Sequence, residues 1–219
     1  MNLRPSLFIL LALAACGSSD PRPASAAGFS PRIDHPYFPL TPGLVWTYVG
    51  SYGPQIRSER VESLSAQRWI EGVACTAIVQ EIEHDGVLEE ITTEWFAQDQ
   101  AGNVWKFGEE TLVPAGSGFS VAESWIAGAG AGKAWIAFPA ELRAGLRFAS
   151  SDEHGAGEFE VRTVEARVAV AAGTYENCAE IVETPDQPDA DIILYAPGVG
   201  RVHEINAEGK VELKSVRRE

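Results

Sequence analysis

Histidine, cysteine, serine and acidic side chains carry most enzyme and metal chemistry, and in this sequence they are thinly spread. Ser124 lacks the flanking glycines of a nucleophile elbow. Adjacent acids such as Glu89 and Glu90 would point to opposite faces of a strand, which does not suit paired-carboxylate hydrolysis. The histidines stand singly, without metal-ligand spacing to a second histidine or to a cysteine: His35, His84, His154 and His203. We therefore expect a non-catalytic protein without a metal site.

Two glycine-containing segments match ligand-binding loops only superficially. Gly128 and Gly132 are separated by three residues where a phosphate-binding loop needs four, and Ala134 follows Lys133 where Ser or Thr is required. The segment from Asp99 to Asn103 lacks the regularly spaced oxygen ligands and the later glutamate of a calcium loop. We expect no cofactor.

The one residue with a strong chemical prediction is Cys16. Arg4 and an apolar run of nine residues, 7–15, precede it, in the order of a secretory signal peptide. The run is too short for a transmembrane helix, which needs about 18 or more apolar residues. Leu13-Ala14-Ala15-Cys16 resembles the lipobox of bacterial lipoproteins, in which the cysteine sulfur receives diacylglycerol and the chain is cut before it. The alternative is an ordinary secreted protein cut nearby.

The lipobox resemblance implies a signal peptide over residues 1–15, lipid attachment at Cys16 and a location in the cell envelope. Several acyl chains, at about 0.8 kcal/mol per buried methylene, would hold the protein at a membrane almost permanently. Gly17, by similarity to Gram-negative lipoproteins, implies the outer membrane, with the protein facing the periplasm. Ser, Pro, Ala and Gly dominate the following residues, so we expect a flexible tether over residues 16–34 and a single domain over residues 35–219.

The charge of the chain limits its partners. Loss of residues 1–15 removes Arg4, which leaves 16 Lys and Arg against 31 Asp and Glu, a formal charge of −15. Nucleic acids are bound through Lys and Arg contacts to phosphate, so we expect no nucleic acid partner.

Two cysteines remain after Cys16, and an oxidising compartment would permit a disulfide between Cys75 and Cys178. Such a bridge would close a large loop, which the chain-entropy estimate values at roughly 4.7 kcal/mol. Two buried free thiols are the equally weighted alternative.

Short runs with period-two alternation, broken by turn residues about every ten positions, predict an all-β protein. Asp85-Gly86 predicts a two-residue hairpin turn, and Asp99 to Gly102 predicts a type I turn. Glycine and alanine crowd residues 109–145, where we expect an irregular excursion. At least nine strands in sequential hairpins favour an antiparallel meander. A meander of this size is expected to form a strongly curved sheet or half-barrel, with a two-sheet sandwich as the alternative.

Aromatic side chains on the predicted strands would either fill the core or line a cavity that faces a ligand. Core packing is the commoner role of aromatic residues near strand centres. The residues with this double interpretation are Trp46, Tyr48, Trp95, Phe96, Trp105 and Phe107.

Four segments, residues 35–48, 97–109, 170–175 and 195–200, together resemble a widespread group of bacterial envelope proteins of unknown function. That group carries a YFPL-x-PG-x-x-W-x-Y entry strand, a GN-V-W hairpin, a VPAG-T-[FY] turn and a YAPGVG turn. The third segment departs from the pattern, with Ala171 in place of the usual proline. The resemblance implies a fold and a location and no reaction.

Three functions follow as hypotheses. The first is a lipid-anchored, non-catalytic module that binds an apolar ligand or a chain segment on its curved sheet. The second is a structural or assembly lipoprotein that presents an interaction surface to another envelope protein. The third is a hydrolase whose site forms only in the tertiary structure.

Overall fold

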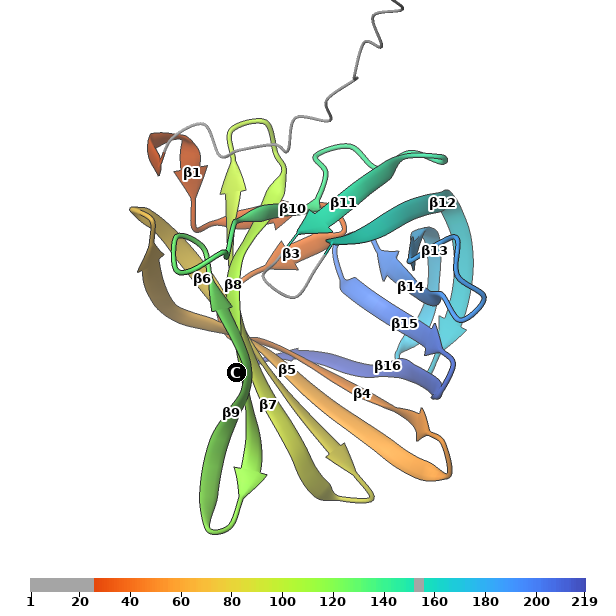
Figure 1. Cartoon of the computed structure of the whole chain (residues 1–219). Helices are drawn as coiled ribbons and strands as arrows, with labels where there is room; N and C mark the ends of the chain where they lie inside the picture. Colours follow the sequence, from red (N-terminus) through yellow and green to blue (C-terminus); the bar gives the residue numbers. More distant parts are fainter. Residues whose placement is uncertain (1–25, 152–155) are drawn as a thin grey trace, which may run out of the picture.

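The computed structural model describes residues 26–151 and 156–219, and most of this part of the chain is antiparallel β-structure (Figure 1). A 14-stranded sheet forms the body, and a separate pair of short strands lies beside it. The all-β prediction of a strongly curved antiparallel sheet is confirmed, and the sheet is not closed into a barrel. No helix among the described residues is long and apolar enough to cross a membrane.

Two meanders make up the large sheet. The first runs through β4 (Leu44–Tyr52), β5 (Gln55–Ile70), β6 (Val73–His84), β7 (Val87–Asp99) and β8 (Val104–Ala115). Two strands then pair with different parts of β8, namely β9 (Gly118–Ile126) and β10 (Trp135–Phe138). The second runs through β11 (Arg147–Ser151), β12 (Ala156–Val170), β13 (Gly173–Glu183), β14 (Asp191–Ala196), β15 (Gly200–Asn206) and β16 (Gly209–Arg218).

The two meanders are joined by the pairing of β4 with β16, which places Tyr48 opposite Leu213. This pairing brings the first long strand beside the last, so the sheet bends into an open trough. The trough's two edges approach each other where the ring of Trp135 on β10 stacks on Phe159 of β12, with centroids 6.2 Å apart.

Local turn chemistry sets the register of both predicted hairpins. Asp85 and Gly86 have φ values of 52° and 77° and connect His84 to its partner Val87, as a two-residue turn with two left-handed positions requires. At the next turn the Gly102 amide donates to the Asp99 carbonyl oxygen at 3.0 Å. Both predicted turns are confirmed.

A short hairpin closes one end of the trough. It consists of β2 (Ile33–His35) and β3 (Phe38–Leu40), with Ile33 and Leu40 buried in the main core. Phe38 stacks on Phe138 with ring centroids 4.6 Å apart and meets Phe96 edge-on at 5.1 Å. We call this element the end hairpin.

Hydrophobic residues form two cores on opposite faces of the sheet. The inner core lies inside the trough and includes Trp46, Tyr48 and Phe96, whereas the outer core covers the other face of β6 to β8 and includes Trp95 and Trp105. Adjacent residues such as Trp95 and Phe96 fall in different cores because successive side chains of a strand point to opposite faces.

The structure corrects two predicted boundaries. The folded domain begins before residue 35, because a 3-10 turn (η1, Ala26–Gly28) leads into β1 (Phe29–Ser30), which pairs with β7. Ile33 is also buried, so residues 26–34 belong to the domain and not to a tether. Much of the excursion predicted over residues 109–145 is strand, because β9 and β10 both pair with β8 and this pairing outweighs the glycine and alanine content.

Candidate functional site: a cavity on the inner face of the sheet

A cavity of about 400 Å³ lies inside the trough and draws its walls from both meanders and from the end hairpin. Aromatic and aliphatic side chains line part of it, among them Phe38, Trp46, Ile78, Ile193 and Tyr195. We call it the inner cavity. Trp46, Ile78, Ile193 and Tyr195 lie on strands of the large sheet and Phe38 lies on the end hairpin, so these walls are formed by β-strands.

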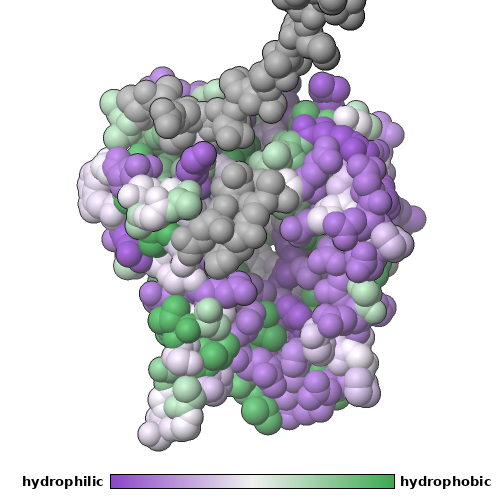
Figure 2. Space-filling view, viewed as in Figure 1, coloured by the Kyte–Doolittle hydropathy of each residue, from purple (hydrophilic) through white to green (hydrophobic). Residues whose placement is uncertain are grey.

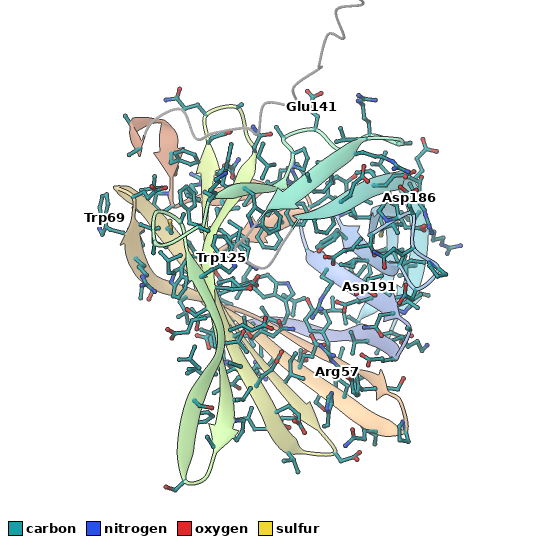
Figure 3. The ribbon with its side chains drawn as sticks, viewed as in Figure 1. Arg57, Trp69, Trp125, Glu141, Asp186 and Asp191 are labelled. Carbon is teal, nitrogen blue, oxygen red and sulfur yellow. The ribbon has the colours of Figure 1, made fainter. Side chains whose placement is uncertain are left out.

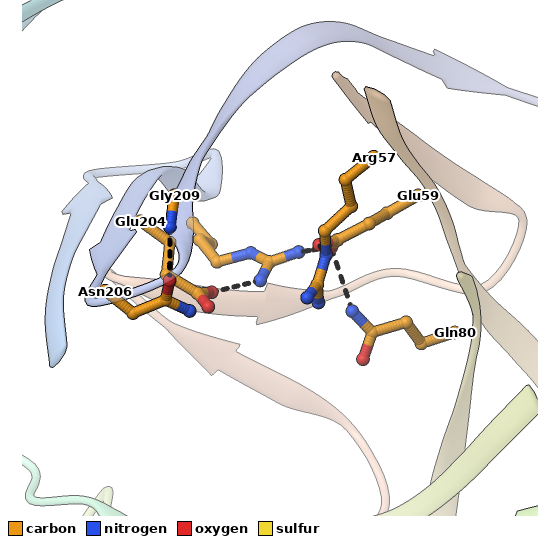
Figure 4. A network of polar contacts seen from close by, with 7 residues as sticks. Arg57, Glu59, Gln80, Glu204, Asn206 and Gly209 are labelled. Atoms are coloured by element: carbon orange, nitrogen blue, oxygen red, sulfur yellow. Dashed lines mark hydrogen bonds and ion pairs between the residues drawn. The ribbon is translucent and has the colours of Figure 1, made fainter. Parts of the chain in front are cut away.

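A polar cluster centred on Glu59 is built into the cavity wall (Figure 4). The Glu59 side chain is completely buried and accepts hydrogen bonds from Arg57 Nε at 2.6 Å and from Gln80 Nε2 at 2.9 Å. Arg201 reaches it from the second meander and also pairs with Glu204. The cluster therefore links β5 and β6 to β15 through one carboxylate.

Tyr48 completes the surroundings of Arg201. The Arg201 guanidinium lies 4.2 Å from the centre of the Tyr48 ring, a cation–π contact, and the Tyr48 hydroxyl donates to the Arg201 carbonyl oxygen at 3.1 Å. The guanidinium charge and the backbone carbonyl oxygen of this buried arginine thus both have partners within the protein.

The buried charges of the cluster hold each other ionised. Burial by itself raises the pKa of Glu59, but the positive charges of Arg201 and Arg57 outweigh burial, and the pKa lies below its ordinary value. Burial disfavours the charged form of Arg201, yet Glu59 and Glu204 raise its pKa well above the ordinary value. At neutral pH the cluster is therefore an ion network and not a set of neutral groups.

Further carboxylates line the inner cavity, and some of them are ion-paired whereas others are not. Glu94 pairs with Lys106 at 2.5 Å, and Lys106 also holds Glu109 at 2.5 Å. Glu90 on β7 and Asp191 on β14 also face the cavity, but neither forms an ion pair or a side-chain hydrogen bond with any described residue.

The six aromatic residues proposed from the sequence divide between three environments. Trp46 and Tyr48 line the inner cavity, and Phe96 packs in the inner core against Phe38. The remaining three, Trp95, Trp105 and Phe107, lie in the outer core, away from the cavity. Two of the six aromatic side chains therefore line the inner cavity, and strand alternation and the end hairpin place the other four in packed cores.

The predicted alternative of a disulfide between Cys75 and Cys178 is not what the structure shows. Both thiols are free and fully buried. Cys75 belongs to the outer core and Cys178 to the inner core, so the sheet itself separates them. Burial raises the pKa of Cys75 to about 12 and also raises the pKa of Cys178, which keeps both as unreactive thiols. Cys16 lies outside the described residues.

The sequence segments that suggested an envelope-protein group have structural roles here. The Trp46 indole donates to the Val199 carbonyl oxygen at 2.8 Å, and the Gly198 amide donates to the Pro36 carbonyl oxygen at 2.7 Å, so the first and last segments meet at the end hairpin. These bonds close the wall of the inner cavity next to Trp46.

Asp99 in the second of those segments serves as a turn clamp. Its carboxylate accepts hydrogen bonds from the Asn103 amide at 2.9 Å, the Asn103 side chain at 2.8 Å and the Trp105 indole at 2.8 Å. The Asn103 side chain in turn accepts from the Ala140 amide at 2.8 Å. The carboxylate oxygens are occupied by N–H donors, which fits a structural turn.

A second, shallower depression of about 590 Å³ lies over Asp34, His35, Gln98 and Leu146. Its polar side chains already bond to the protein: Gln98 exchanges two hydrogen bonds with Asp34, and His35 Nε2 contacts the Pro139 carbonyl oxygen at 3.0 Å. Among the residues the structure describes, no group of three His, Cys, Asp or Glu side chains is arranged to hold a metal ion. The inner cavity is therefore the better candidate.

The sequence matches no protein-family profile and no curated protein sequence. Among solved structures, the chain is similar to a "putative lipoprotein" from Parabacteroides distasonis ATCC 8503, with a TM-score of 0.43 and 11% sequence identity over 84% of this chain and 99% of the other. A likeness of this degree establishes neither the fold nor the function of this chain.

Sequence reasoning missed the charged residues of the cavity, above all Arg57, Glu59 and Arg201. One signal was present: Arg57 and Glu59 alternate with Val61, so all three share the face of β5 that turns inward. Charges at inward positions of a strand require partners, because an unpaired buried charge is costly. The partner Arg201 lies 142 residues away from Glu59, so only the folded sheet identifies it.

Proposed function

We propose that this protein is a non-catalytic lipoprotein of the bacterial cell envelope, anchored by lipid on Cys16, that binds a ligand with an apolar portion in the inner cavity. The observation that carries the binding proposal is the cavity itself, with Trp46, Ile78 and Ile193 on its wall. Its volume of about 400 Å³ falls within the roughly 300–1,000 Å³ of typical small-molecule sites.

The architecture supports binding over catalysis. The buried polar groups next to the cavity, Glu59 and Arg201, are bonded to each other and to Gln80 and Tyr48. A general base or nucleophile must instead offer a reactive atom to the substrate. The ion network is better suited to holding the two meanders at a set distance, which fixes the width of the cavity.

Binding of a neutral apolar dye tests the cavity. The full chain carrying Cys16→Ser, which has no lipid to compete, should increase the fluorescence of N-phenyl-1-naphthylamine. Ile193→Trp, which fills the cavity, should abolish most of that increase, whereas Ile205→Trp, at a position 38% exposed on β15, should retain it. Thermal unfolding of both variants checks that they fold. Equal dye binding by the two folded variants would contradict the proposal.

The anchoring part of the proposal is tested in cells. A bacterial host fed an alkyne-labelled fatty acid should incorporate label into the full chain and place it in the membrane fraction. Cys16→Ser should remove both the label and the membrane association, and Cys75→Ser should leave both unchanged. A labelled Cys16→Ser variant would show that the lipid is attached elsewhere or that the cysteine has no such role.

A second candidate function rests on the projecting hairpin of β8 and β9. Phe119 and Val121 on this hairpin are 52% and 58% exposed, and Ile56 and Val87 are exposed at the two neighbouring hairpin tips. These tips point to the same end of the molecule, opposite β1, and apolar surface shows at that end (Figures 1 and 2). Such a surface would suit a structural lipoprotein that meets another envelope protein away from its own anchor.

Site-specific crosslinking separates this candidate from the first. A photoreactive amino acid at position 119 should capture one defined protein in intact cells at native abundance, and the same group at exposed position 69, 71% exposed at a distance along β5, should not. Absence of a defined product at position 119 would remove this candidate and leave the ligand-binding proposal intact.

A further inference from the structure

The positive charges that line the inner cavity are already neutralised by the protein. Arg57 and Arg201 are the two basic side chains on its wall, and both bond to the buried carboxylate of Glu59. Arg201 is also paired with Glu204. An anionic ligand would therefore have to displace a buried ion pair, whose breaking leaves an uncompensated charge.

The negative charges are in excess. Five carboxylates line the cavity, from Glu90, Glu94, Glu183, Asp191 and Glu204, against those two arginines. Glu94 is matched by Lys106 and Glu204 by Arg201, whereas Glu90 and Asp191 have no ion-pair partner among the described residues. Asp191 and Arg57 lie on facing sides of the hollow, on β14 and β5 (Figure 3).

The unmatched carboxylates are partly withdrawn from water. Burial, and then the charges of Glu123 and Glu59, raise the pKa of Glu90, although Arg57 and His84 partly offset them. Burial, followed by the charges of Glu204, Asp189 and Glu208, raises the pKa of Asp191. A positive group beside either carboxylate would offset the repulsion from these neighbouring acids, and a half-buried ion pair gains more than an exposed one.

Apolar and aromatic walls adjoin the same carboxylates. Ile78 and Ile82 line the cavity on the side of Glu90. Ile193 and Tyr195 line it on the side of Asp191. The faces of Trp46 and Tyr195 also offer π surfaces that attract cations. The cavity thus combines space for a hydrocarbon or aromatic body with two unpaired acceptors for a positive head.

We propose that the inner cavity selects small amphiphiles that carry a positively charged amine, and discriminates against neutral and anionic molecules with the same apolar body. The proposal deepens the binding function above and rests on it. Glu90 and Asp191 are the specificity-determining residues, and the Glu59 cluster is the positioning element that keeps the neighbouring arginines from attracting anions.

Three probes of matched chain length test the proposal: octylamine, octanol and octanoate, each titrated calorimetrically into the full chain carrying Cys16→Ser at pH 7.5. Octylamine should bind about tenfold or more tightly than octanol, which corresponds to about 1.4 kcal/mol. Octanoate should bind more weakly than octanol. Raising the salt concentration should reduce the preference for the amine, because exposed parts of the ion pairs are screened.

Two variants place the effect on named residues. Glu90→Gln and Asp191→Asn should each lower the affinity for octylamine several-fold and leave the affinity for octanol unchanged. Glu83→Gln is the matched control, because Glu83 carries the same charge, is exposed, and follows the cavity-lining Ile82 on β6, so that its side chain points to the opposite face. Loss of octylamine affinity equal in Glu83→Gln and Glu90→Gln would show a general effect of net charge and overturn the assignment.

The outcomes separate the charge preference from the binding function. Equal affinity for octylamine and octanol, both lost in Ile193→Trp, would overturn the charge preference and leave the cavity as a binding site. Tightest binding of octanoate would overturn the preference and indicate that the arginines dominate. No binding of any probe, together with no dye binding, would overturn both proposals.

Discussion

Tyr48 and Arg201 hold each other by two different contacts, one through the aromatic ring and one through the hydroxyl group. The Arg201 guanidinium lies 4.2 Å from the Tyr48 ring centre, and the Tyr48 hydroxyl donates to the Arg201 backbone at 3.1 Å. The residues lie on β4 and β15, with β16 between them. This contact, with the Glu59 cluster, ties the first meander to the second across the inner face.

Replacement of the central carboxylate tests how strongly the cluster supports the fold. Glu59→Gln leaves Arg57 and Arg201 without their shared negative partner, and we expect a loss of about 3–5 kcal/mol in the free energy of unfolding. Glu62→Gln removes the partly exposed pair with Arg60, at 2.7 Å, and should cost at most about 1 kcal/mol. Urea unfolding at pH 7 measures both, and equal losses would contradict a structural role for the buried cluster.

The bond between Trp46 and Val199 predicts a specific cost for a small change. Trp46→Phe keeps an aromatic ring but removes the indole donor, so we expect a loss of about 1–2 kcal/mol from the hydrogen bond and the unpaired carbonyl oxygen. Trp69 is 71% exposed, and Trp69→Phe should change stability by less than about 0.5 kcal/mol. Denaturant midpoints compare the two, and a Trp46→Phe variant as stable as Trp69→Phe would be inconsistent with this bond.

His35 predicts a stability that depends on pH. Its Nε2 donates to the Pro139 carbonyl oxygen at 3.0 Å and its Nδ1 accepts from the Tyr37 amide at 3.2 Å, which requires the neutral ring. Burial lowers the pKa of His35 below 6.5, although the Pro139 bond and the charge of Asp34 partly offset it. The unfolded chain therefore takes up the proton first, and this contribution to stability is complete above pH 6.5 and falls as the pH drops below it.

Thermal unfolding between pH 8 and pH 5 measures that dependence. The unfolding temperature of the wild type should fall as the pH drops below 6.5, and His35→Gln should show a smaller fall over the same range. His203 also has a lowered pKa because of burial, so part of the slope should remain in the variant. Identical slopes for wild type and His35→Gln would rule out His35 as a contributor.

The two buried thiols predict a simple chemical result. In the chain carrying Cys16→Ser, neither Cys75 nor Cys178 should react with a thiol reagent in the native state, because both are buried with raised pKa values. Two thiols should react once the protein is unfolded, without any reductant. A mass two hydrogens lower before reduction would instead reveal a disulfide and contradict the separate placement of the two residues.

Much of the local structure could be predicted from the residues alone. Period-two alternation indicated most strands. The two turns lie at the predicted positions, with left-handed backbone at Asp85 and Gly86 and with a hydrogen bond from the Gly102 amide to the Asp99 carbonyl oxygen. These features depend on neighbours in the sequence. Part of the excursion predicted over residues 109–145 is instead strand, because pairing with β8 decided its conformation more strongly than local composition.

Only the tertiary structure decided which strand faces enclose a cavity. Alternation shows that Trp95 and Phe96 point to opposite faces, but not that one face turns inward, because the bend depends on the pairing of β4 with β16 across more than 150 residues. The same pairing brings Arg201 to Glu59, and the end hairpin closes the space beside Trp46. The lipid-anchoring prediction for Cys16 rests on a contiguous motif, whereas the inner cavity depends on contacts between distant residues that become neighbours only on folding.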